Sequence, residues 1–376
     1  SAILFGLSPR FSLFNTLRIS LLPLFNLVIV SAFLNLSSND YLGIANDVTL
    51  KEEFYKEYRP KLSSSSSRLI DGSYSEIMEL EKRAEEIYGK PCIMFNSGFD
   101  ANSSLIETFC DKNTLILTDR LNHASIYDGI VNSGAEFLRY KHLDMLGLEK
   151  LLQKYSDRYE DILVISESVY SMDGDVADIE KLVELKRKYN FSLMLDEAHS
   201  YGVYGYGIAY NLNLVSEIDF LVIPLGKGGG SVGAMVICEG YLKNYIINKS
   251  RKFIFSTALP PVNSSWNLFI LGKMEEFDER RVKLELLKNH TLKLLKERGI
   301  ETTSTTHIIS IIIGDNERIG KIGQNMKERG YLLYPVKEPT VPKGTARFRI
   351  GLNPYITYEE IEKFVEELKY EIDTIF

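Results

Sequence analysis

Three polar side chains follow apolar runs that are typical of β-strands, and their types suit chemistry between an amine and a carbonyl group. Asp196 and His199 come after the run at residues 191–195, and Lys227 comes after the run at 220–225. Open α/β sheets bind ligands at the carboxyl ends of such strands. An amine there can form a Schiff base with pyridoxal phosphate, while a carboxylate keeps the pyridine nitrogen protonated. The pattern therefore indicates a pyridoxal phosphate site.

Two other interpretations fit the same three residues. The segment Asp196-Glu197-Ala198-His199 also occurs as the acidic box of helicase-type ATPases, where it follows a phosphate loop. This chain has no G-x-x-x-x-G-K-[ST] motif, which argues against an ATPase. An ordinary strand-end carboxylate beside a solvated lysine also stays open at this point, so the rest of the chain has to decide.

Composition narrows the class of protein. With 376 residues and 45% hydrophobic content, the chain is long enough for two or three domains with a large core. Its net charge of −7 gives no basic footprint for nucleic acid or an anionic membrane. The three isolated cysteines fit a reducing compartment, so we expect a cytoplasmic protein without a structural metal site. We expect surface or packing roles for His142, His290 and His307.

The first 37 residues contain no acidic residue and include a long uncharged run. Such a run could indicate a membrane span or a targeting segment. Pro23, Asn26, Ser31 and Asn35 interrupt it, so we expect an N-terminal arm covered by the core or by a second subunit, and no membrane span.

Short apolar runs alternate with helical patterns over most of the chain. This alternation predicts an α/β fold with a mostly parallel sheet and helices on both faces. The pattern changes after Pro260-Pro261 to a helix-rich stretch followed by mixed elements. We therefore predict an N-terminal arm at 1–45, a large domain at 46–262 and a smaller α+β domain at 263–376.

Further polar groups follow other predicted strands. Gly98 and Phe99 begin a helix whose first N–H groups could hold a phosphate. The imidazole of His123 could stack on a flat ring, and Ser171 offers a hydroxyl. Each of these residues alone would be interpreted as part of an ordinary turn, and only their occurrence together favours a site.

Taken in order, these segments resemble the α-oxoamine synthases, which are pyridoxal phosphate enzymes of the aspartate-aminotransferase fold (fold type I). The resemblance runs from residue 35 to about 368 and covers nearly nine-tenths of the chain. The matching segments are Asn39-Asp40-Tyr41-Leu42-Gly43, Ser67-Arg68-Leu69, Ser97-Gly98-Phe99, Asn122-His123-Ala124-Ser125, Ser171-Met172-Asp173-Gly174-Asp175, Asp196-Glu197-Ala198-His199-Ser200, Gly226-Lys227 and Ser256-Thr257-Ala258-Leu259-Pro260-Pro261.

The resemblance implies a role for each cofactor-side residue. Lys227 would carry the Schiff base and act as the base at the substrate Cα, and Asp196 would pair with the pyridinium nitrogen. His199 and Ser171 would hold the O3′ oxygen of the ring, with His123 stacked on its face. Gly98 and Phe99 would lie near the phosphate or the ring.

It also implies substrate-side residues and a shared site. Arg349 would bind the amino acid carboxylate, because a planar guanidinium suits a carboxylate, and Asn39, Thr340 and Lys337 would lie near the substrate. Ser256 and Thr257 would reach the phosphate held by a neighbouring subunit. The resemblance therefore implies a homodimer with shared active sites.

The C-terminal segments at 312–316 and 339–349 most resemble the branch of the family that joins L-alanine to a pimeloyl thioester in biotin biosynthesis. The thioester would be carried by CoA or by a carrier protein. Three alternatives stay open: glycine with acetyl-CoA, serine with a long-chain acyl-CoA, or a non-catalytic subunit on the same fold.

The chain departs from the family at several positions. Pro224 replaces a phosphate-binding Thr or Ser three residues before Lys227, and proline has neither a hydroxyl nor an N–H. Lys337 replaces an arginine, and Ile77 replaces a histidine. Serines at 63–67 replace a glycine-rich loop, which restricts backbone conformations with positive φ.

Overall fold

The computed structural model describes residues 33–375, so most of the N-terminal arm expected at 1–45 lies outside the described residues. In its described part, β1 (Leu34–Asn35) pairs in parallel with β10 (Tyr331–Leu332) near the other end of the sequence. α2 (Val48–Glu57) follows, capped by Asp47. Among residues 33–375, no helix has the length and apolar character needed to cross a membrane.

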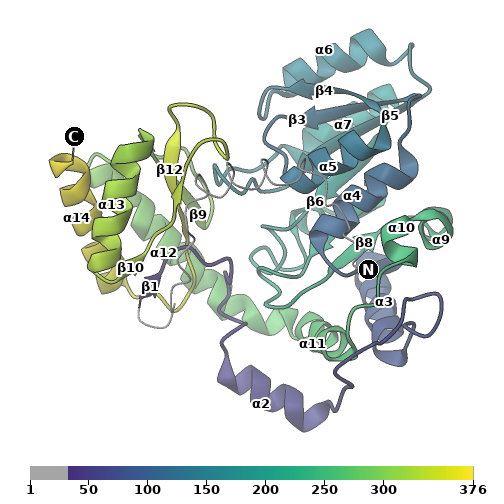
Figure 1. Ribbon diagram of the computed structural model, residues 1–376, viewed down its shortest axis with the longest axis horizontal. Helices are drawn as coiled ribbons and strands as arrows, with labels where there is room; N and C mark the ends of the chain where they lie inside the picture. Colours follow the sequence, from purple (N-terminus) through teal and green to yellow (C-terminus); the bar gives the residue numbers. More distant parts are fainter. Residues whose placement is uncertain (1–32, 376) are drawn as a thin grey trace, which may run out of the picture.

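A seven-stranded sheet forms the centre of the larger part of the molecule (Figure 1). The strand order is β2-β8-β7-β6-β5-β3-β4, and β8 alone runs antiparallel to its neighbours within this sheet. The strands are β2 (Cys92–Phe95), β3 (Thr114–Asp119), β4 (Glu136–Tyr140), β5 (Asp161–Glu167), β6 (Ser192–Asp196), β7 (Phe220–Pro224) and β8 (Ala234–Ile237).

Helices cover both faces of this sheet, because alternate strand residues point to opposite sides. In β3, Ile116 packs into one apolar cluster, while Leu115 and Leu117 pack into the other. The first cluster includes side chains of α4 (Gly98–Phe109), α5 (Ala124–Ser133), α9 (Gly240–Lys249) and α10 (Arg251–Ile254). The second includes α3 (Ser75–Tyr88), α6 (Met145–Tyr155), α7 (Ile179–Tyr189) and α11 (Pro261–Gly272). The predicted fold class is confirmed.

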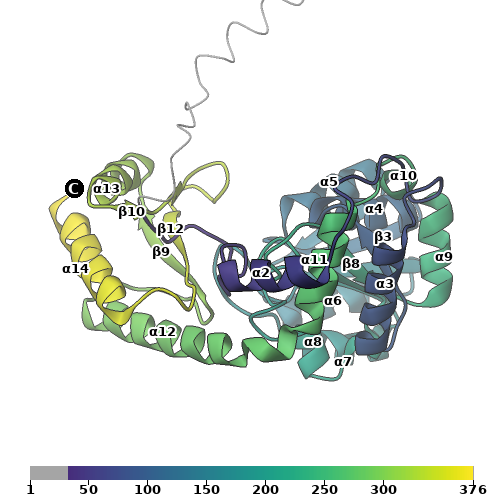
Figure 2. The same cartoon turned by 90° about the horizontal axis from the view of Figure 1, so that it is seen from below.

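A second body holds the C-terminal elements (Figures 1 and 2). Its antiparallel sheet has the order β11-β12-β9, and α12 crosses from the larger body toward it (Figure 2). The elements are α12 (Asp278–Glu297), β9 (Ile308–Gly314), α13 (Asn316–Glu328), β11 (Pro335–Val336), β12 (Ala346–Gly351) and α14 (Tyr358–Thr374). The domain limits given above stay predictions; α11, which begins at Pro261, packs on α3 of the larger body.

Smaller elements complete the described chain. They are α8 (Ile208–Asn211) and the 3-10 helices η2 (Val215–Glu217) and η3 (Met274–Phe277). In the serine run, Ser65 adopts a positive φ of 54°, a conformation that glycine accepts more readily. Ile77 is a core residue of α3. The two departures from the family pattern at these positions are thus accommodated by a left-handed turn residue and by packing.

His142 ties together three segments at the carboxyl edge of the large sheet. Its Nδ1 lies 3.0 Å from Asp119 at the end of β3, and its Nε2 lies 2.9 Å from Asp175 in the turn after β5. Its ring also meets the edge of Tyr170 at a centroid distance of 4.5 Å. Burial disfavours the charged imidazole, but hydrogen bonds to both carboxylates outweigh this and raise the pKa of His142 to about 9.

We expect His142→Asn to destabilise the protein by about 2 kcal/mol at pH 6, because two charge-assisted hydrogen bonds are lost. The folded-state pKa of about 9 lies above the ordinary value of 6.5, so this contribution is complete below pH 6.5 and disappears as pH rises through 9. Urea unfolding of the wild type and the variant at pH 6 and at about pH 10 measures the difference in their free energies of unfolding. An equal difference at both pH values would contradict a charged His142 between Asp119 and Asp175.

Candidate active site

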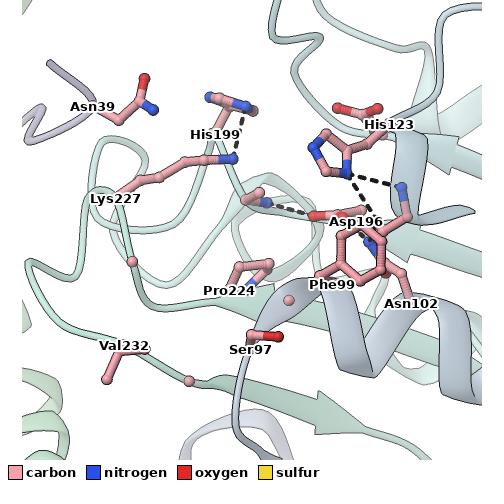
Figure 3. A pocket seen from close by; sticks show the side chains of 16 residues that line it. Asn39, Ser97, Phe99, Asn102, His123, Asp196, His199, Pro224, Lys227 and Val232 are labelled. Atoms are coloured by element: carbon pink, nitrogen blue, oxygen red, sulfur yellow. Dashed lines mark hydrogen bonds between the residues drawn. The ribbon is translucent and has the colours of Figure 1, made fainter. Parts of the chain in front are cut away.

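A cavity of about 290 Å³ opens at the carboxyl edge of the large sheet (Figure 3). It lies there because β3, β5, β6 and β7 are parallel, so the chain leaves each strand at the same edge. Except for Asn39, the lining residues end or follow strands of this sheet, lie in the first turns of the next helix, or directly precede β8. The lining residues are Asn39, Ser97, Gly98, Phe99, Asn102, His123, Ser125, Glu167, Asp196, Ala198, His199, Pro224, Gly226, Lys227, Val232 and Gly233.

Lys227 extends along one wall of this cavity, and its Nζ lies 2.9 Å from Nε2 of His199 (Figure 3). The next residue, Gly228, packs so closely on the loop after β6 that an added Cβ would lie 2.1 Å from the carbonyl oxygen of Tyr201. Burial lowers the pKa of Lys227, and the charge of Arg349 acts in the same direction, whereas Asp196 opposes it. The site thus favours the neutral amine more than water does.

Asp196 presents a buried carboxylate in the middle of the cavity. Its Oδ2 accepts a hydrogen bond of 2.6 Å from the side-chain amide of Asn102 on α4, and its Oδ1 accepts one of 2.8 Å from the backbone N–H of Ala198. Asn102 also lies 3.1 Å from the hydroxyl of Ser125. These donors fix the orientation of the carboxylate. Asn102 could not be identified from the sequence, because a polar residue within a helix carries no signal of its own.

His123 lies across the cavity from Lys227, at the start of α5 (Figure 3). Its Nδ1 accepts from the backbone N–H of Ser125 at 3.2 Å and lies 2.8 Å from the same residue's hydroxyl. Burial and the charge of Lys227 lower the pKa of His123, although Asp196 opposes them. A neutral, fixed imidazole at this place suits contact with the face of an aromatic ring.

Glu167 is a buried carboxyl group that residue type and spacing alone did not single out. It ends β5 as Asp196 ends β6, and the two residues are paired in register. Its Oε1 has no hydrogen-bond partner among the described residues. Burial, together with the charge of Asp196, raises the pKa of Glu167 to about 8, so this carboxyl group is protonated at neutral pH.

The other end of the cavity is formed by Ser97, Gly98 and Pro224. Ser97 caps α4 by accepting the N–H of Asp100 at 3.0 Å, while the first N–H groups of a helix have no intrahelical partner and favour anions. Gly98 is packed against Pro224 so tightly that an added Cβ would lie 2.7 Å from the proline Cγ. This end therefore offers backbone N–H groups to a phosphate, with no hydroxyl from position 224.

Arg349 of β12 brings the C-terminal sheet to the same region. Its Nε donates to the carbonyl oxygen of Ser171 at 2.7 Å, and its Nη2 donates to the hydroxyl of Tyr41 at 2.6 Å. Among residues 33–375, no carboxylate forms an ion pair with Arg349. Its positive charge is therefore available to a substrate anion.

Ser171 and Thr340 line a second cavity, of about 1140 Å³, which meets the first at His123. Lys337 lines neither cavity; its Nζ lies beside Gly320 on α13. Ser256 and Thr257 lie on a separate small pocket together with Arg68 and Asn96. The structure thus brings seven of the predicted residues to one cavity, namely Asn39, Gly98, Phe99, His123, Asp196, His199 and Lys227. Ser171 and Thr340 line the second cavity, whereas Arg349, Lys337, Ser256 and Thr257 line neither of the two.

The aminotransferase class I and II family matches residues 31–368, and the chain belongs to this family. Within it, the chain is an α-oxoamine synthase, a pyridoxal phosphate-dependent acyltransferase. A protein of Glaesserella parasuis, provisionally named 8-amino-7-oxononanoate synthase, is 44% identical over 87% of this chain and 88% of its own length. A protein of the same provisional name from Pasteurella multocida is 41% identical over 89% of each chain.

Two solved structures share the fold. Serine palmitoyltransferase from S. paucimobilis, with a bound PLP–myriocin aldimine, superposes with a TM-score of 0.84 at 26% identity, over 91% of this chain and 89% of that one. The crystal structure of 8-amino-7-oxononanoate synthase from Francisella tularensis gives a TM-score of 0.76 at 26% identity, over 91% and 98% of the two chains.

The cavity fits pyridoxal phosphate on its own chemistry. Asp196, with a buried and doubly hydrogen-bonded carboxylate, suits a pyridinium nitrogen. Lys227 supplies a desolvated amine for the aldehyde, and the first backbone N–H groups of α4, which begins at Gly98, suit a phosphate. These residues would hold the group at its ring nitrogen, its aldehyde carbon and its phosphate.

We expect Glu167→Gln to become progressively more stable than the wild type as pH rises from 4.5 to 8. The folded protein keeps a proton on Glu167 up to about pH 8, whereas the unfolded chain releases it near 4.5. This proton release lowers the free energy of unfolding of the wild type as pH rises, and glutamine, which has no such proton, removes the effect. Urea unfolding of the two apoproteins at both ends of this range provides the measurement. A constant difference between them would show that Glu167 is ionised in the fold.

We expect Pro224→Thr to bind pyridoxal phosphate about tenfold more tightly, because one hydrogen bond to a charged oxygen is gained. The matched control is Pro224→Val, which has the same branched shape without the hydroxyl. Equilibrium titration of each apoprotein with the cofactor gives the dissociation constants. Equal affinities for the threonine and valine variants would mean that position 224 does not face the phosphate.

Proposed function

We propose that this enzyme condenses L-alanine with a pimeloyl thioester of CoA or of a carrier protein, and releases CO2, the thiol and 8-amino-7-oxononanoate for biotin biosynthesis. The observation that carries the proposal is the combination of relatives of that name at 41–44% identity with a half-buried Lys227 that lines the same cavity as Asp196. The expected homodimer, with Ser256 and Thr257 reaching the partner's cofactor, is part of the proposal.

Lys227 is proposed to move the proton at the substrate Cα. Its amine is the one lysine group that lines the cavity among the described residues, and burial favours its neutral, basic form. When bound, pyridoxal phosphate supplies an electron sink that spreads the negative charge left at Cα. Asp196 would support this by keeping the ring nitrogen protonated, and His123 would contact the face of the ring.

Arg349 is proposed to bind the amino acid carboxylate, because its charge has no carboxylate partner among residues 33–375. A bond then forms between Cα and the thioester carbonyl carbon while the carbon–sulfur bond breaks, and the sulfur leaves as a thiolate that takes a proton from water. The carboxylate departs as CO2, and Lys227 returns a proton to Cα. The second cavity, which meets the first at His123, gives room for the acyl chain.

One other substrate pair has an observation in its favour. The serine palmitoyltransferase structure superposes more closely than that of 8-amino-7-oxononanoate synthase, with TM-scores of 0.84 and 0.76. Serine with a long-chain acyl thioester is therefore the second candidate. The higher identity of the relatives provisionally named 8-amino-7-oxononanoate synthase favours alanine.

We expect thiol release from pimeloyl-CoA to require L-alanine and to be much slower with glycine or serine, because each amino acid presents a different side chain to the same cavity. Lys227→Ala should lower the rate about 10²–10⁴-fold, the range for losing a positioned base. Lys337→Ala is the matched control, since Lys337 lines neither cavity and its loss should change the rate little.

Release of thiol with serine and palmitoyl-CoA, but not with alanine and pimeloyl-CoA, would replace the first candidate by the second. Absence of release with every pair, together with no cofactor absorbance after addition of pyridoxal phosphate, would favour a non-catalytic subunit. Mass spectrometry of the product distinguishes the amino acid that was incorporated.

A further inference from the structure

Tyr41 lies at the centre of a buried hydrogen-bond network that links the two bodies of the molecule. Its side chain is fully buried, and its hydroxyl lies 2.7 Å from Nδ1 of His199, 2.6 Å from Nη2 of Arg349 and 3.0 Å from Oδ1 of Asn39. His199 in turn contacts Nζ of Lys227 at 2.9 Å. One hydroxyl thus touches the partner of the reactive amine and also the arginine proposed to bind substrate.

The donors and acceptors in this network restrict each other. A guanidinium only donates, so Arg349 occupies one lone pair of the Tyr41 oxygen. The single hydroxyl proton must then point to Asn39 or to His199. Burial and the charge of Lys227 lower the pKa of His199 far below 6.5, so its imidazole is neutral and carries one N–H.

Two arrangements satisfy the donors and acceptors that Arg349, Tyr41 and His199 share, and each suits one protonation state of Lys227; in the second, the amide oxygen of Asn39 no longer receives the Tyr41 proton. When Tyr41 donates to Asn39, it accepts the Nδ1–H of His199, which leaves a lone pair on Nε2 for an ammonium group. When Tyr41 donates to Nδ1 of His199, the imidazole proton is on Nε2 and donates to a neutral amine. The orientation of one hydroxyl therefore changes together with the tautomer of the histidine.

We propose that Tyr41 is a positioning residue that supports the ammonium form of Lys227 through the tautomer of His199, while it holds Arg349 in place. In this role Tyr41 couples the amine to the carboxylate-binding arginine without touching the reacting atoms. The proposal rests on the roles of Lys227 and Arg349 in the proposed function. Burial raises the pKa of Tyr41, so its hydroxyl stays protonated and can donate.

A change at Tyr41 leaves the other charged groups near the network in place, except that Arg349 loses one hydrogen-bond acceptor. Those that face Lys227 and His199 are Asp196, Glu167, Arg349, His123 and His307. His307 packs edge-on against the Tyr41 ring at 4.2 Å, and burial lowers the pKa of His307 to about 3, so it stays neutral. Replacement of Tyr41 by phenylalanine therefore removes only the hydroxyl.

Nitrogen NMR of the ¹⁵N-histidine-labelled wild-type apoprotein tests the tautomer directly, with the signal of His199 identified by its loss in His199→Gln. We expect the proton on Nδ1 while Lys227 is charged and on Nε2 after Lys227 loses its proton. A proton that stays on Nε2 throughout the titration would overturn the proposal. Because no substrate is present, this result does not depend on which amino acid the enzyme accepts.

In Tyr41→Phe, a proton on Nδ1 of His199 would be buried without an acceptor, so we expect the tautomer with the proton on Nε2. That tautomer has no lone pair on Nε2, so the ammonium form of Lys227 loses its hydrogen-bond acceptor. We expect the pH midpoint for attachment of pyridoxal phosphate to Lys227, trapped with borohydride, to fall by about one unit, a tenfold change in the equilibrium. Binding of propionate by Arg349 should weaken about tenfold.

Tyr204→Phe is the matched control, since Tyr204 also packs near His307 and makes no side-chain hydrogen bond within residues 33–375. We expect the wild-type midpoint and propionate affinity for this variant. A wild-type midpoint in Tyr41→Phe would overturn the proposal. If Tyr41→Phe does not fold, the His199 tautomer measured in the wild type alone decides whether the proposal holds.

Discussion

The parallel register of β3, β5, β6 and β7 is the constraint on which the rest of this enzyme depends. Parallel strands end at one edge of the sheet, so Lys227 meets His199, 28 positions away in the sequence, and shares a cavity with His123, 104 positions away. The same register places Glu167 beside Asp196. The hydrophobic contacts on both faces of the sheet therefore stabilise an arrangement of polar groups that would not assemble in water.

Hydrogen bonding then gives the two neighbouring carboxyl groups different properties. Asp196 receives an amide and a backbone N–H, whereas Glu167 keeps an oxygen without a partner. A buried carboxylate needs such donors, and Asp196 has them, whereas the raised pKa of Glu167 keeps its proton in place. Lys227 is desolvated in the same cavity. One pair of strand ends thus places a hydrogen-bonded carboxylate and a neutral acid in the cavity that the amine of Lys227 also lines.

Much of the fold could be predicted from the sequence, because buried parallel strands are continuous apolar runs and polar residues follow them directly. Lys227, Asp196 and His199 were identifiable for this reason. The role of Tyr41 was not, since it depends on contacts with Arg349, 308 positions away. The antiparallel β8 was also missed, because four apolar residues carry no direction. The placement of Lys337 beside α13 depends on the packing of the C-terminal body, which residue type does not determine.

The contact between Gly98 and Pro224 also limits the order in which this site can change during evolution. The proline ring fills the space that any side chain at position 98 would need. A substitution at Gly98 is therefore accessible only after position 224 has changed, whereas Pro224 can change first. At these two positions, which are 126 residues apart in the sequence, the substitutions can therefore occur in one order, with Pro224 changing before Gly98.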